Sequence, residues 1–441
     1  MRQTLNPPVL PVLALSMIDL ILPLLGIGLC AIAFLQLALW SAHSISQWSH
    51  NRQQFAVSMD VLRQQIETAS QTETSVNNEG PIGVWQGFRE FVVHRLVRET
   101  DVATSVYFKP IDGKPIVDFK PGQHLTFKFD IPGKTKPEVR CYSLSEAANG
   151  DTYRITVKKC FPPRDSEGVP PGVVSTFVNT SLMEGDRIQL KAPSGSFFLD
   201  EVSTAPVVML AGGVGITPMA SMIDHVIRQN SNRTMILVYG SRNGKDHIYK
   251  DHFKTITERH ANIHIINVYS DPEPEDKEGI DYHSSGFVSI DLLKKLLPNN
   301  HCQFYMCGPG PFMEIMYKGL IDWQVPNSRI FYEAFGPASV KRVNVVTEEE
   351  DATEVSSSSK IKFSSVPDPI AWSGKYESIL ELAEDNGIEI DSGCRAGSCG
   401  TCQTALLKGK VRYPEGAQPD CDPGHCLACI AKPEGDVELD V

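Results

Sequence analysis

The sequence lacks an excess of positive charge. Its 441 residues carry 41 Lys and Arg against 53 Asp and Glu, which gives a formal net charge of -12. Nucleic-acid-binding domains need basic surfaces to neutralise phosphates, so nucleic acid is not expected as a partner. The charge is also uneven, because residues 361–441 contain 14 acidic and 7 basic side chains. Such an acidic end is suited to docking on a protein with a basic face.

Long apolar runs are also missing, with one exception. Residues 20–40 contain no charged side chain over 21 positions, about the length that crosses the hydrocarbon core of a bilayer. The run is too long for the apolar part of a secretory signal. We therefore expect a single transmembrane helix within an N-terminal segment of residues 1–42. The flanking basic residues are too sparse to set its orientation.

Two segments lack the apolar periodicity of folded elements. Residues 43–83 are polar and predict a stalk, while residues 341–360 are acidic and rich in serine, which predicts a disordered linker. No internal repeat is present between them. The hydrophobic period changes near residue 204, so the sequence predicts folded domains over residues 84–203, 204–340 and 361–441.

The cysteines lack the distribution of a disulfide scaffold. Six of the eleven lie at or after Cys394, which indicates a reducing compartment. Cys394, Cys399 and Cys402 are separated by four and two residues on a loop rich in Gly and Ser, and Cys426 and Cys429 follow. This spacing is typical of the plant-type [2Fe-2S] site, in which three thiolates come from one tight loop and the fourth from a distant residue.

The fourth ligand is either Cys426 or Cys429. We favour Cys429, because residues 430–433 resemble the run after the last ligand in ferredoxin domains of reductases. A zinc site made of two Cys-x2-Cys pairs is the alternative, but it leaves Cys394 without a role. The flanking sequence resembles the β-grasp ferredoxin domain, with a helix over residues 378–386 capped by Gly387 and strands over 404–407 and 437–439.

Residues 84–203 alternate between apolar and polar positions, as short antiparallel strands do. The predicted strands cover residues 90–93, 104–108, 124–129, 140–145 and 153–158, and residues 191–198 are expected to form the last one. Several short strands separated by turn residues favour a β-barrel.

The barrel carries the run Arg140-Cys-Tyr142-Ser143, which resembles the flavin signature of the ferredoxin-NADP reductase superfamily, including its flavohaemoglobin branch. The resemblance implies that Arg140 pairs with a flavin phosphate, that Tyr142 packs against the isoalloxazine and that Ser143 bonds near N5. These roles suit the side chains, because arginine binds phosphate through two N–H groups and a phenol ring offers a flat surface.

A predicted helix start follows about 30 residues later. Its position resembles the place where the family binds the flavin diphosphate on helix amides, which implies that Gly172, Val174 and Ser175 contact the cofactor. The long segment from residue 160 to 171 is suited to covering an adenine. We therefore expect FAD, with FMN as the alternative.

Residues 204–340 change to the pattern of a Rossmann-like α/β domain. A buried strand over residues 206–211 leads into Gly212, Gly213 and Gly215, and Thr217 then precedes a proline, as an N-cap does. A strand, a glycine turn and a helix N-terminus together form a pyrophosphate site. Further strands are expected over residues 235–239, 263–268 and 303–307.

The family resemblance extends along this domain. It implies that Cys307, Gly308 and Pro309 lie beside the nicotinamide. A nucleophilic role for Cys307 has no support from a neighbouring His or Asn in the sequence. Ser241 and Arg242 follow the second strand, where relatives contact the adenosine ribose. An arginine there is compatible with NADPH but also occurs with NADH, which we favour.

The segment Tyr332 to Pro337 resembles the closing segment of the family, in which an aromatic ring stacks on the flavin. The resemblance implies this role for Phe335, with Glu333 nearby. The candidate catalytic residues are therefore Tyr142, Ser143, Cys307 and Phe335.

The whole chain is expected to be a multidomain protein made of a transmembrane helix, a β-barrel, an α/β domain and a ferredoxin domain. This order resembles oxygenase reductases and the hybrid-cluster-protein reductase. It implies an oxidoreductase that passes electrons from NADH through FAD to the cluster and on to an oxygenase or desaturase, from domains that face the cytoplasm. A quinone or other small acceptor is the alternative within enzymes, and a membrane-tethered redox sensor is the alternative outside them. No globin precedes the barrel, so nitric oxide dioxygenation by this chain alone is not expected.

Overall fold

The computed structural model describes Gln36, Trp85 and residues 87–162, 170–335, 359–373, 376–393, 395, 397, 400–414 and 421–441. The predicted transmembrane run, apart from Gln36, lies outside the described residues, and so do the stalk and nearly all of the 341–360 linker. Within the described ranges, no helix is both long and apolar enough to cross a membrane.

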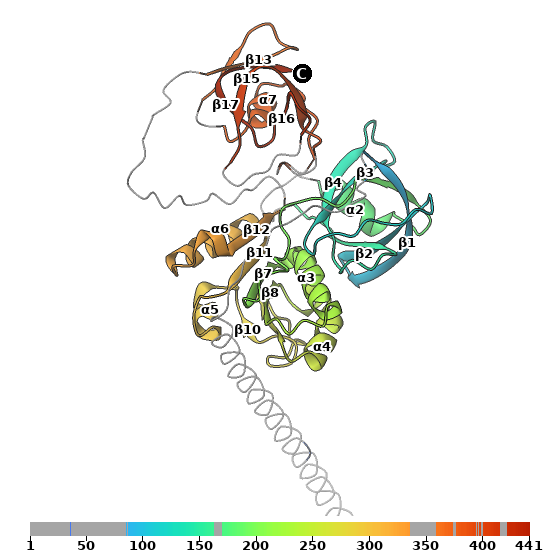
Figure 1. Cartoon of the computed structure of the whole chain (residues 1–441). Helices are drawn as coiled ribbons and strands as arrows, with labels where there is room; N and C mark the ends of the chain where they lie inside the picture. The colour runs from blue at the N-terminus through green and yellow to red at the C-terminus, as the bar shows by residue number, and fades with distance from the viewer. Residues whose placement is uncertain are drawn as a thin grey trace, which may run out of the picture. The chain divides into compact units, whose positions relative to one another are not determined.

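The described residues form three sheets, and each sheet is built from one continuous segment of chain (Figure 1). The predicted barrel, α/β and ferredoxin segments each contribute one sheet. The three sheets have separate hydrophobic cores, apart from a few barrel residues such as Ala103 and Phe197 that join the core of the α/β domain.

The first sheet is antiparallel and has the strand order β4-β3-β6-β1-β2-β5. Its strands are β1 (Arg89–Thr100), β2 (Ala103–Pro110), β3 (His124–Phe129), β4 (Glu138–Ser143), β5 (Tyr153–Lys158) and β6 (Arg187–Leu190). A bridge between Leu144 and Ile155 brings the two outer strands together, which closes the barrel. Helix α2 (Val173–Thr180) contributes Val174 and Val178 to its core.

The last barrel strand was predicted in the wrong place. Residues 191–198 do not form it; β6 ends at Leu190 and pairs with β1 and β3. Pro193 lacks the N–H that a ladder needs, and Gly195 has a φ of +111° that no regular strand contains. The segment continues as a loop, which makes only one bridge, between Ser194 and His124.

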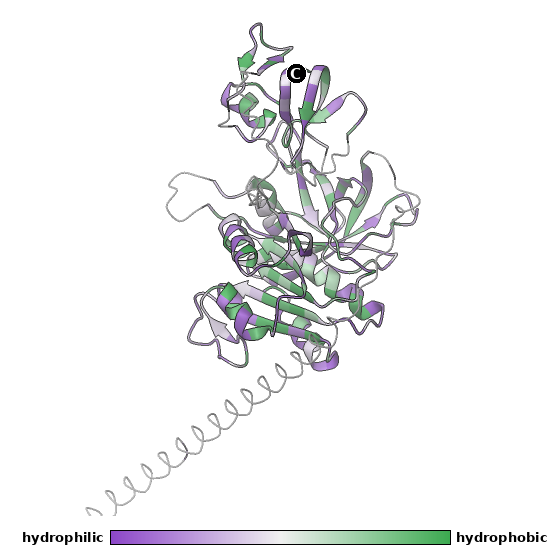
Figure 2. Cartoon of the chain, turned by 60° about the vertical axis from the view of Figure 1, so that its left-hand side comes forward, coloured by the Kyte–Doolittle hydropathy of each residue, from purple (hydrophilic) through white to green (hydrophobic). Residues whose placement is uncertain are grey.

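The second sheet is parallel and has the order β10-β9-β8-β7-β11-β12. Its strands are β7 (Val207–Gly212), β8 (Met235–Ser241), β9 (Ile263–Tyr269), β10 (Ser284–Ser285), β11 (Gln303–Gly308) and β12 (Ile330–Ala334). Helices α3 (Ile216–Arg228) and α4 (Lys250–Arg259) cover one side, and α5 (Ile290–Leu296) and α6 (Gly310–Asp322) cover the other. Its central strands are almost uniformly hydrophobic, as strands covered on both faces should be (Figure 2).

The chain order reverses between β7 and β11. After β7 the chain moves outward through β8 and β9, and it then returns to β11 on the other side of β7. In open α/β sheets ligands bind at the carboxyl ends of the strands at this switch point. The nucleotide site is therefore expected at the ends of β7 and β11.

The start of α3 differs from the prediction. Thr217 is not the N-cap, because a 3-10 turn, η1 (Gly213–Gly215), runs directly into the helix and makes Gly215 the N-cap. The Thr217 hydroxyl donates instead to the carbonyl of Val214, at 3.0 Å. No side chain caps the helix, the Ile216 amide bonds the carbonyls of Gly213 and Val214, and Pro218 has no N–H, so the Thr217 amide is the candidate donor to an anion in this first turn.

The third sheet has the order β14-β13-β17-β15-β16. Its elements are β13 (Lys360–Phe363), β14 (Ile370–Ala371), α7 (Ile379–Asp385), β15 (Gln403–Arg412), β16 (His425–Leu427) and β17 (Lys432–Asp440). The first and last long strands pair in parallel and α7 packs on the sheet, as in the predicted β-grasp fold. Ser378 caps α7 by accepting from the Glu381 amide, and Gly387 has a φ of +71° after its end, as predicted.

Candidate functional site

Strand β4 carries the flavin signature. The ring of Tyr142 packs edge-on against Phe127 and Phe129, with centroids 5.9 and 6.4 Å apart, and burial raises the pKa of its hydroxyl. Arg140 lies 3.0 Å from the carboxylate of Glu138, and its side chain is 41% exposed. The barrel therefore fixes the tyrosine and leaves the guanidinium accessible to a ligand.

Helix α2 supplies an anion site beside this strand. Gly172 is its N-cap and no side chain caps the helix. The Ser175 hydroxyl accepts from the Cys160 amide and donates to the Gly172 carbonyl, each at 3.0 Å, which fixes the first turn. The Thr176 hydroxyl is buried and has no hydrogen-bond partner among the described residues. Open amides and an unpartnered hydroxyl fit the diphosphate of a flavin nucleotide.

Glu333 connects the barrel with the α/β domain at the flavin signature. The Ser143 hydroxyl donates to one oxygen of its carboxylate at 3.2 Å, and Nδ1 of His124 lies 3.3 Å from the other. The backbone of Glu333 is paired with that of Cys307 on the neighbouring strand. His124 was not predicted; its ring lies where a Cβ on Gly195 would come within 2.8 Å, so the glycine makes room for it.

Cys307 lies at the end of β11 and is fully buried. Burial, together with the negative charge of Glu333, raises the pKa of its thiol well above the ordinary value. A raised pKa keeps the thiol neutral, which argues against a nucleophilic role, since thiolate is the reactive form.

Three glycines allow the backbone segments of the switch point to approach closely. A Cβ on Gly215 would lie 2.1 Å from the carbonyl oxygen of Cys307, one on Gly308 would lie 2.6 Å from the ring of Phe312, and one on Gly212 would lie 3.0 Å from Pro309. Gly213 adopts a φ of +55°, which glycine adopts at little cost. This cradle of bare backbone fits a pyrophosphate.

The end of β8 fits the adenosine ribose. The Ser241 hydroxyl is buried and has no partner among the described residues, so it can bond a ligand hydroxyl. Arg242 is engaged by Asp271, with Nη2 3.0 Å from Oδ2. Asp276 binds the amide of Gly244 beside them, which brings a second carboxylate to this end of the sheet.

Phe335 directly follows β12 and is 38% exposed. It lies two residues after Glu333, so it is near the end of the strand that reaches Ser143. This placement is compatible with a ring that stacks on the flavin, as predicted.

The cluster loop is only partly described. Cys394 and Cys399 lie outside the described residues, while Cys402 and Cys429 are buried. Gly397 packs so tightly that a Cβ would come within 2.3 Å of Ile430, the residue after Cys429. The amide of Ala428 donates to the carbonyl of Cys402 at 3.1 Å. The loop that carries the first cysteines therefore lies against the turn that carries Cys429.

Cys426 is completely buried on β16. Burial raises the pKa of its thiol to about 12, and the charges of Cys402 and Cys421 add to the effect. The described residues contain no group of three metal-ligating side chains. The choice between Cys426 and Cys429 therefore stays a prediction.

Three protein families match the chain in sequence. Residues 100–199 match the oxidoreductase FAD-binding domain, residues 209–318 match the oxidoreductase NAD-binding domain and residues 373–434 match the 2Fe-2S iron-sulfur cluster binding domain. The chain therefore contains the FAD-binding and NAD-binding domains of oxidoreductases together with a 2Fe-2S cluster binding domain. These matches confirm the three domains that the sequence predicted, for FAD, for NAD and for a [2Fe-2S] cluster. The zinc alternative and the FMN alternative are not supported.

Similar proteins share parts of this arrangement. The flavohemoprotein of Halalkalibacterium halodurans is 39% identical over 257 residues, which are 58% of this chain and 62% of that protein. Phthalate dioxygenase reductase is 23% identical with a TM-score of 0.48, over 80% of this chain and 98% of that one. An intact type IV self-sufficient cytochrome P450 monooxygenase is 19% identical with a TM-score of 0.52, over 80% of this chain and 41% of that one. The chain thus spans less than two thirds of the flavohemoprotein.

The residues missed in the sequence are those whose role depends on contacts between distant segments. His124 lies on an ordinary strand and gains its partner from Glu333, more than 200 residues later. Thr176 is distinguished only by its lack of a partner in the folded chain. A histidine among apolar strand residues was the one available signal.

Proposed function

We propose that this chain passes electrons from NADH through FAD to its [2Fe-2S] cluster and then to a protein acceptor. The proposal rests on one hydrogen bond, which joins Ser143 of the flavin signature to Glu333 at the nucleotide switch point. This contact brings the predicted flavin and nicotinamide sites together. The C-terminal cluster domain on the same chain supplies the route onward.

The residues of the two domains hold the reactants in place. The amides of α2 and the Thr176 hydroxyl would hold the diphosphate of FAD, and Tyr142 would pack on its ring. The cofactor would supply the chemistry that couples a two-electron hydride donor, NADH, to a one-electron centre. The cradle of Gly212, Gly215 and Gly308 binds the pyrophosphate of NADH. The Glu333 carboxylate accepts from Ser143 and so orients that hydroxyl at the reacting face.

The surroundings of Arg242 support NADH as the donor. Asp271 already neutralises this guanidinium, and further acidic residues follow in the same loop. A 2′-phosphate would meet carboxylates there, whereas a ribose hydroxyl can bond Ser241. We therefore expect NADH to be used in preference to NADPH.

A protein acceptor with a basic face is favoured by the charge of the cluster domain. An oxygenase, a desaturase or a haem protein would suit a one-electron donor, and the similarity to flavohemoproteins supports a haem partner. A small acceptor such as a quinone is the competing proposal. The redox-sensor alternative predicts slow turnover with every acceptor.

We also propose that residues 20–40 anchor the protein in a membrane with its redox domains in the cytoplasm. The support is the uncharged run itself. Tethering would raise the effective concentration of the cluster near a membrane-bound acceptor. The full chain should sediment with membranes, and deletion of residues 1–80 should release it. Sedimentation of the deleted form would contradict the anchor.

The central test is an anaerobic titration of the chain with NADH, followed by visible absorbance and low-temperature EPR. We expect the flavin band to bleach and a rhombic signal of the reduced cluster to appear, with NADPH much less effective. The Cys429→Ser variant should bleach without a normal cluster signal, while the matched Cys426→Ser variant should keep it. A chain that binds FAD but is not reduced by NADH would overturn the proposal.

A further inference from the structure

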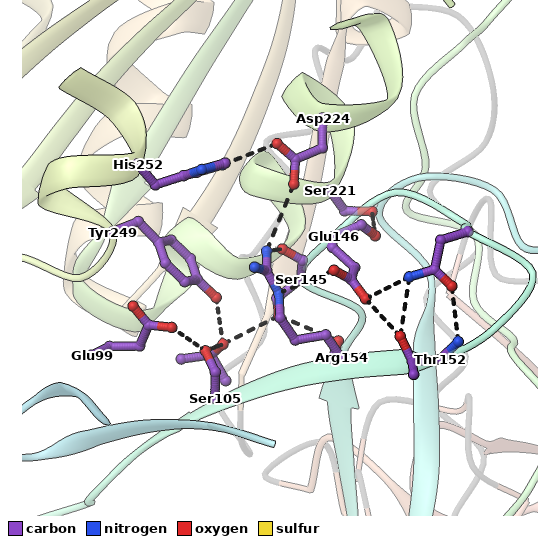
Figure 3. Close-up of polar contacts among 12 residues, drawn as sticks. Glu99, Ser105, Ser145, Glu146, Thr152, Arg154, Ser221, Asp224, Tyr249 and His252 are labelled. Atoms are coloured by element: carbon purple, nitrogen blue, oxygen red, sulfur yellow. Dashed lines mark hydrogen bonds and ion pairs between the residues drawn. The ribbon is translucent and has the colours of Figure 1, made fainter. Parts of the chain in front are cut away.

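A second contact between the barrel and the α/β domain lies beside the flavin signature (Figure 3). It is formed by Ser145, Glu146, Arg154 and Thr156 of the barrel and by Ser221, Asp224 and Tyr249 of the α/β domain, and we call it the Arg154 junction. Its charged members are Arg154, Glu146 and Asp224, whose side chains are between 9% and 15% exposed, and burying charges is a costly way to hold two domains together.

Arg154 is the centre of the junction. Its Nε donates to the Ser145 hydroxyl at 3.1 Å, and its Nη2 donates to the carbonyl of the same residue. The guanidinium lies 4.0 Å from Glu146 in its own domain and 3.7 Å from Asp224 on α3. It also lies over the ring of Tyr249, 5.1 Å from the centroid. One cation therefore bonds both domains at once.

Directional hydrogen bonds add to this charge. The Ser221 hydroxyl donates to the carbonyl of Glu146 at 2.8 Å, and the hydroxyls of Thr156 and Tyr249 share a short hydrogen bond. Tyr249 has a φ of +64°, an uncommon and strained backbone for a bulky residue. The surrounding contacts hold it there, so its ring is fixed in one place.

The junction is linked through the chain to both predicted cofactor sites. Ser145 lies two residues after Ser143, a span of about 7 Å at most. Ser221 lies on α3, five residues after the helix begins at the glycine cradle, or about 8 Å along the helix axis. The junction thus ties the segment that contacts the flavin to the helix that binds NADH.

We propose that the Arg154 junction sets the position of the nicotinamide site relative to the flavin site, so that Arg154 and Tyr249 are positioning residues for hydride transfer. This inference rests on the proposed function. Hydride transfer demands close approach of two reacting atoms, and a misplacement of about 1 Å can reduce its rate on the order of 10²-fold. The contacts at Glu333 and at Arg154, together with the ion pair of Lys158 and Asp246 at 3.2 Å, prevent rotation of the two domains about any one of them alone.

The test compares Arg154→Met with the full-length holoenzyme. We expect the limiting rate of flavin bleaching by NADH in stopped flow to fall about tenfold, while the NADH dissociation constant changes less than about threefold. Hydrogen exchange should rise at β5, at the middle of α3 and around Tyr249, and the cores of both domains should keep their protection. Electron transfer from chemically reduced flavin to the cluster should be unchanged.

Arg98→Met is the matched control. Arg98 is an exposed arginine of the barrel whose hydrogen bonds, to Asn179, Asp101 and Thr104, stay within the barrel. It should leave both the bleaching rate and the exchange at the junction unchanged. Tyr249→Phe removes only one hydroxyl and is the second test variant, to be used if Arg154→Met loses its FAD. It should reduce the limiting rate of flavin bleaching by about threefold or more.

The outcomes separate this inference from the proposed function. A wild-type chain that NADH does not bleach would remove the proposed function itself. The positioning role would be overturned by a different result. In that case NADH bleaches the wild type normally, and the variants show raised hydrogen exchange at the junction but an unchanged limiting rate of flavin bleaching. If the rate of flavin bleaching falls only in proportion to the FAD that a variant has lost, the junction has a structural role and no positioning role.

Discussion

At the scale of single residues, the buried histidines of the α/β domain have a measurable consequence. His247 lies between Tyr239 and Tyr269, and its Nδ1 is 2.7 Å from the Tyr269 hydroxyl. Burial lowers its pKa to about 3, with Lys250 adding to the effect, and burial lowers the pKa of His283 to about 4. Both side chains are therefore neutral in the folded domain at neutral pH.

These shifts predict acid sensitivity. The folded pKa values lie below the value of about 6.5 in an unfolded chain. The contribution of the two neutral histidines to the free energy of unfolding is therefore fully present above pH 6.5, and it is lost as the pH falls toward their folded pKa values. Within that pH range, each histidine should lower the free energy of unfolding by up to ~1.4 kcal/mol per pH unit. His247→Phe keeps a ring in place but removes the proton uptake of His247. The free energy of unfolding, measured with denaturant between pH 7 and 5, should therefore fall less steeply with pH, by a slope that corresponds to about one proton.

The exposed His301 provides a control for this experiment. His301→Phe should leave the pH dependence as it is in the wild type. Equal slopes for His247→Phe and the wild type would show that His247 is protonated without cost in the folded state.

The residues show where sequence reasoning stops. Ser143, Cys307 and Gly215 could be found because local spacing and a family resemblance marked them, and the structure places them around one switch point. The Thr217 cap was wrong because a local rule cannot see that η1 continues into the helix. Arg154, Tyr249 and His124 could not be found, because their partners come from another domain, and nothing in the local pattern encodes that contact.

At the scale of elements, the close approach of η1 to β11 makes Gly215 a structural requirement of the nucleotide site. Its φ is ordinary, so conformational freedom is not the reason for a glycine there. The reason is space, since the carbonyl of Cys307 occupies the position that a Cβ would take. Backbone cannot move aside as a side chain can.

Gly215→Ala should therefore destabilise the α/β domain by about 1–3 kcal/mol and weaken NADH binding at least tenfold. Thermal unfolding and NADH titration of the flavin band measure these effects. Gly240→Ala is the matched control in the same sheet, because its Cβ would lie 3.2 Å from a side-chain carbon of Val288 and 3.6 Å, an ordinary contact distance, from the carbonyl of Ala211. If both variants bind NADH like the wild type, the cradle is not formed as described.

At the scale of the whole molecule, the flavin and nucleotide domains share a boundary of specific contacts, whereas the cluster domain has its own core. The barrel and α/β domains should therefore work as a pair without the rest. The sequence predicted this division well, because composition changes sharply at residues 341–360. It could not predict how the paired domains contact one another.

A chain limited to residues 84–340 should bind FAD and reduce ferricyanide with NADH at close to the full rate. It should lose nearly all reduction of cytochrome c, since the cluster delivers single electrons to proteins. Parallel assays with the two acceptors test this division. Equal cytochrome c reduction by both forms would show that electrons leave directly from the flavin.

In the first and third sheets, the strand that comes first in the chain pairs with the strand that comes last, which bears on how the protein is made. Strand β1 pairs with β6, which is the last strand of its sheet in the chain, and no strand is borrowed from a later sheet. The barrel can therefore close once residue 190 has left the ribosome, before the nucleotide domain has been synthesised. Likewise, β13 pairs with β17, so the third sheet can be completed only after residue 439 has been synthesised. The two domains before it can therefore fold first.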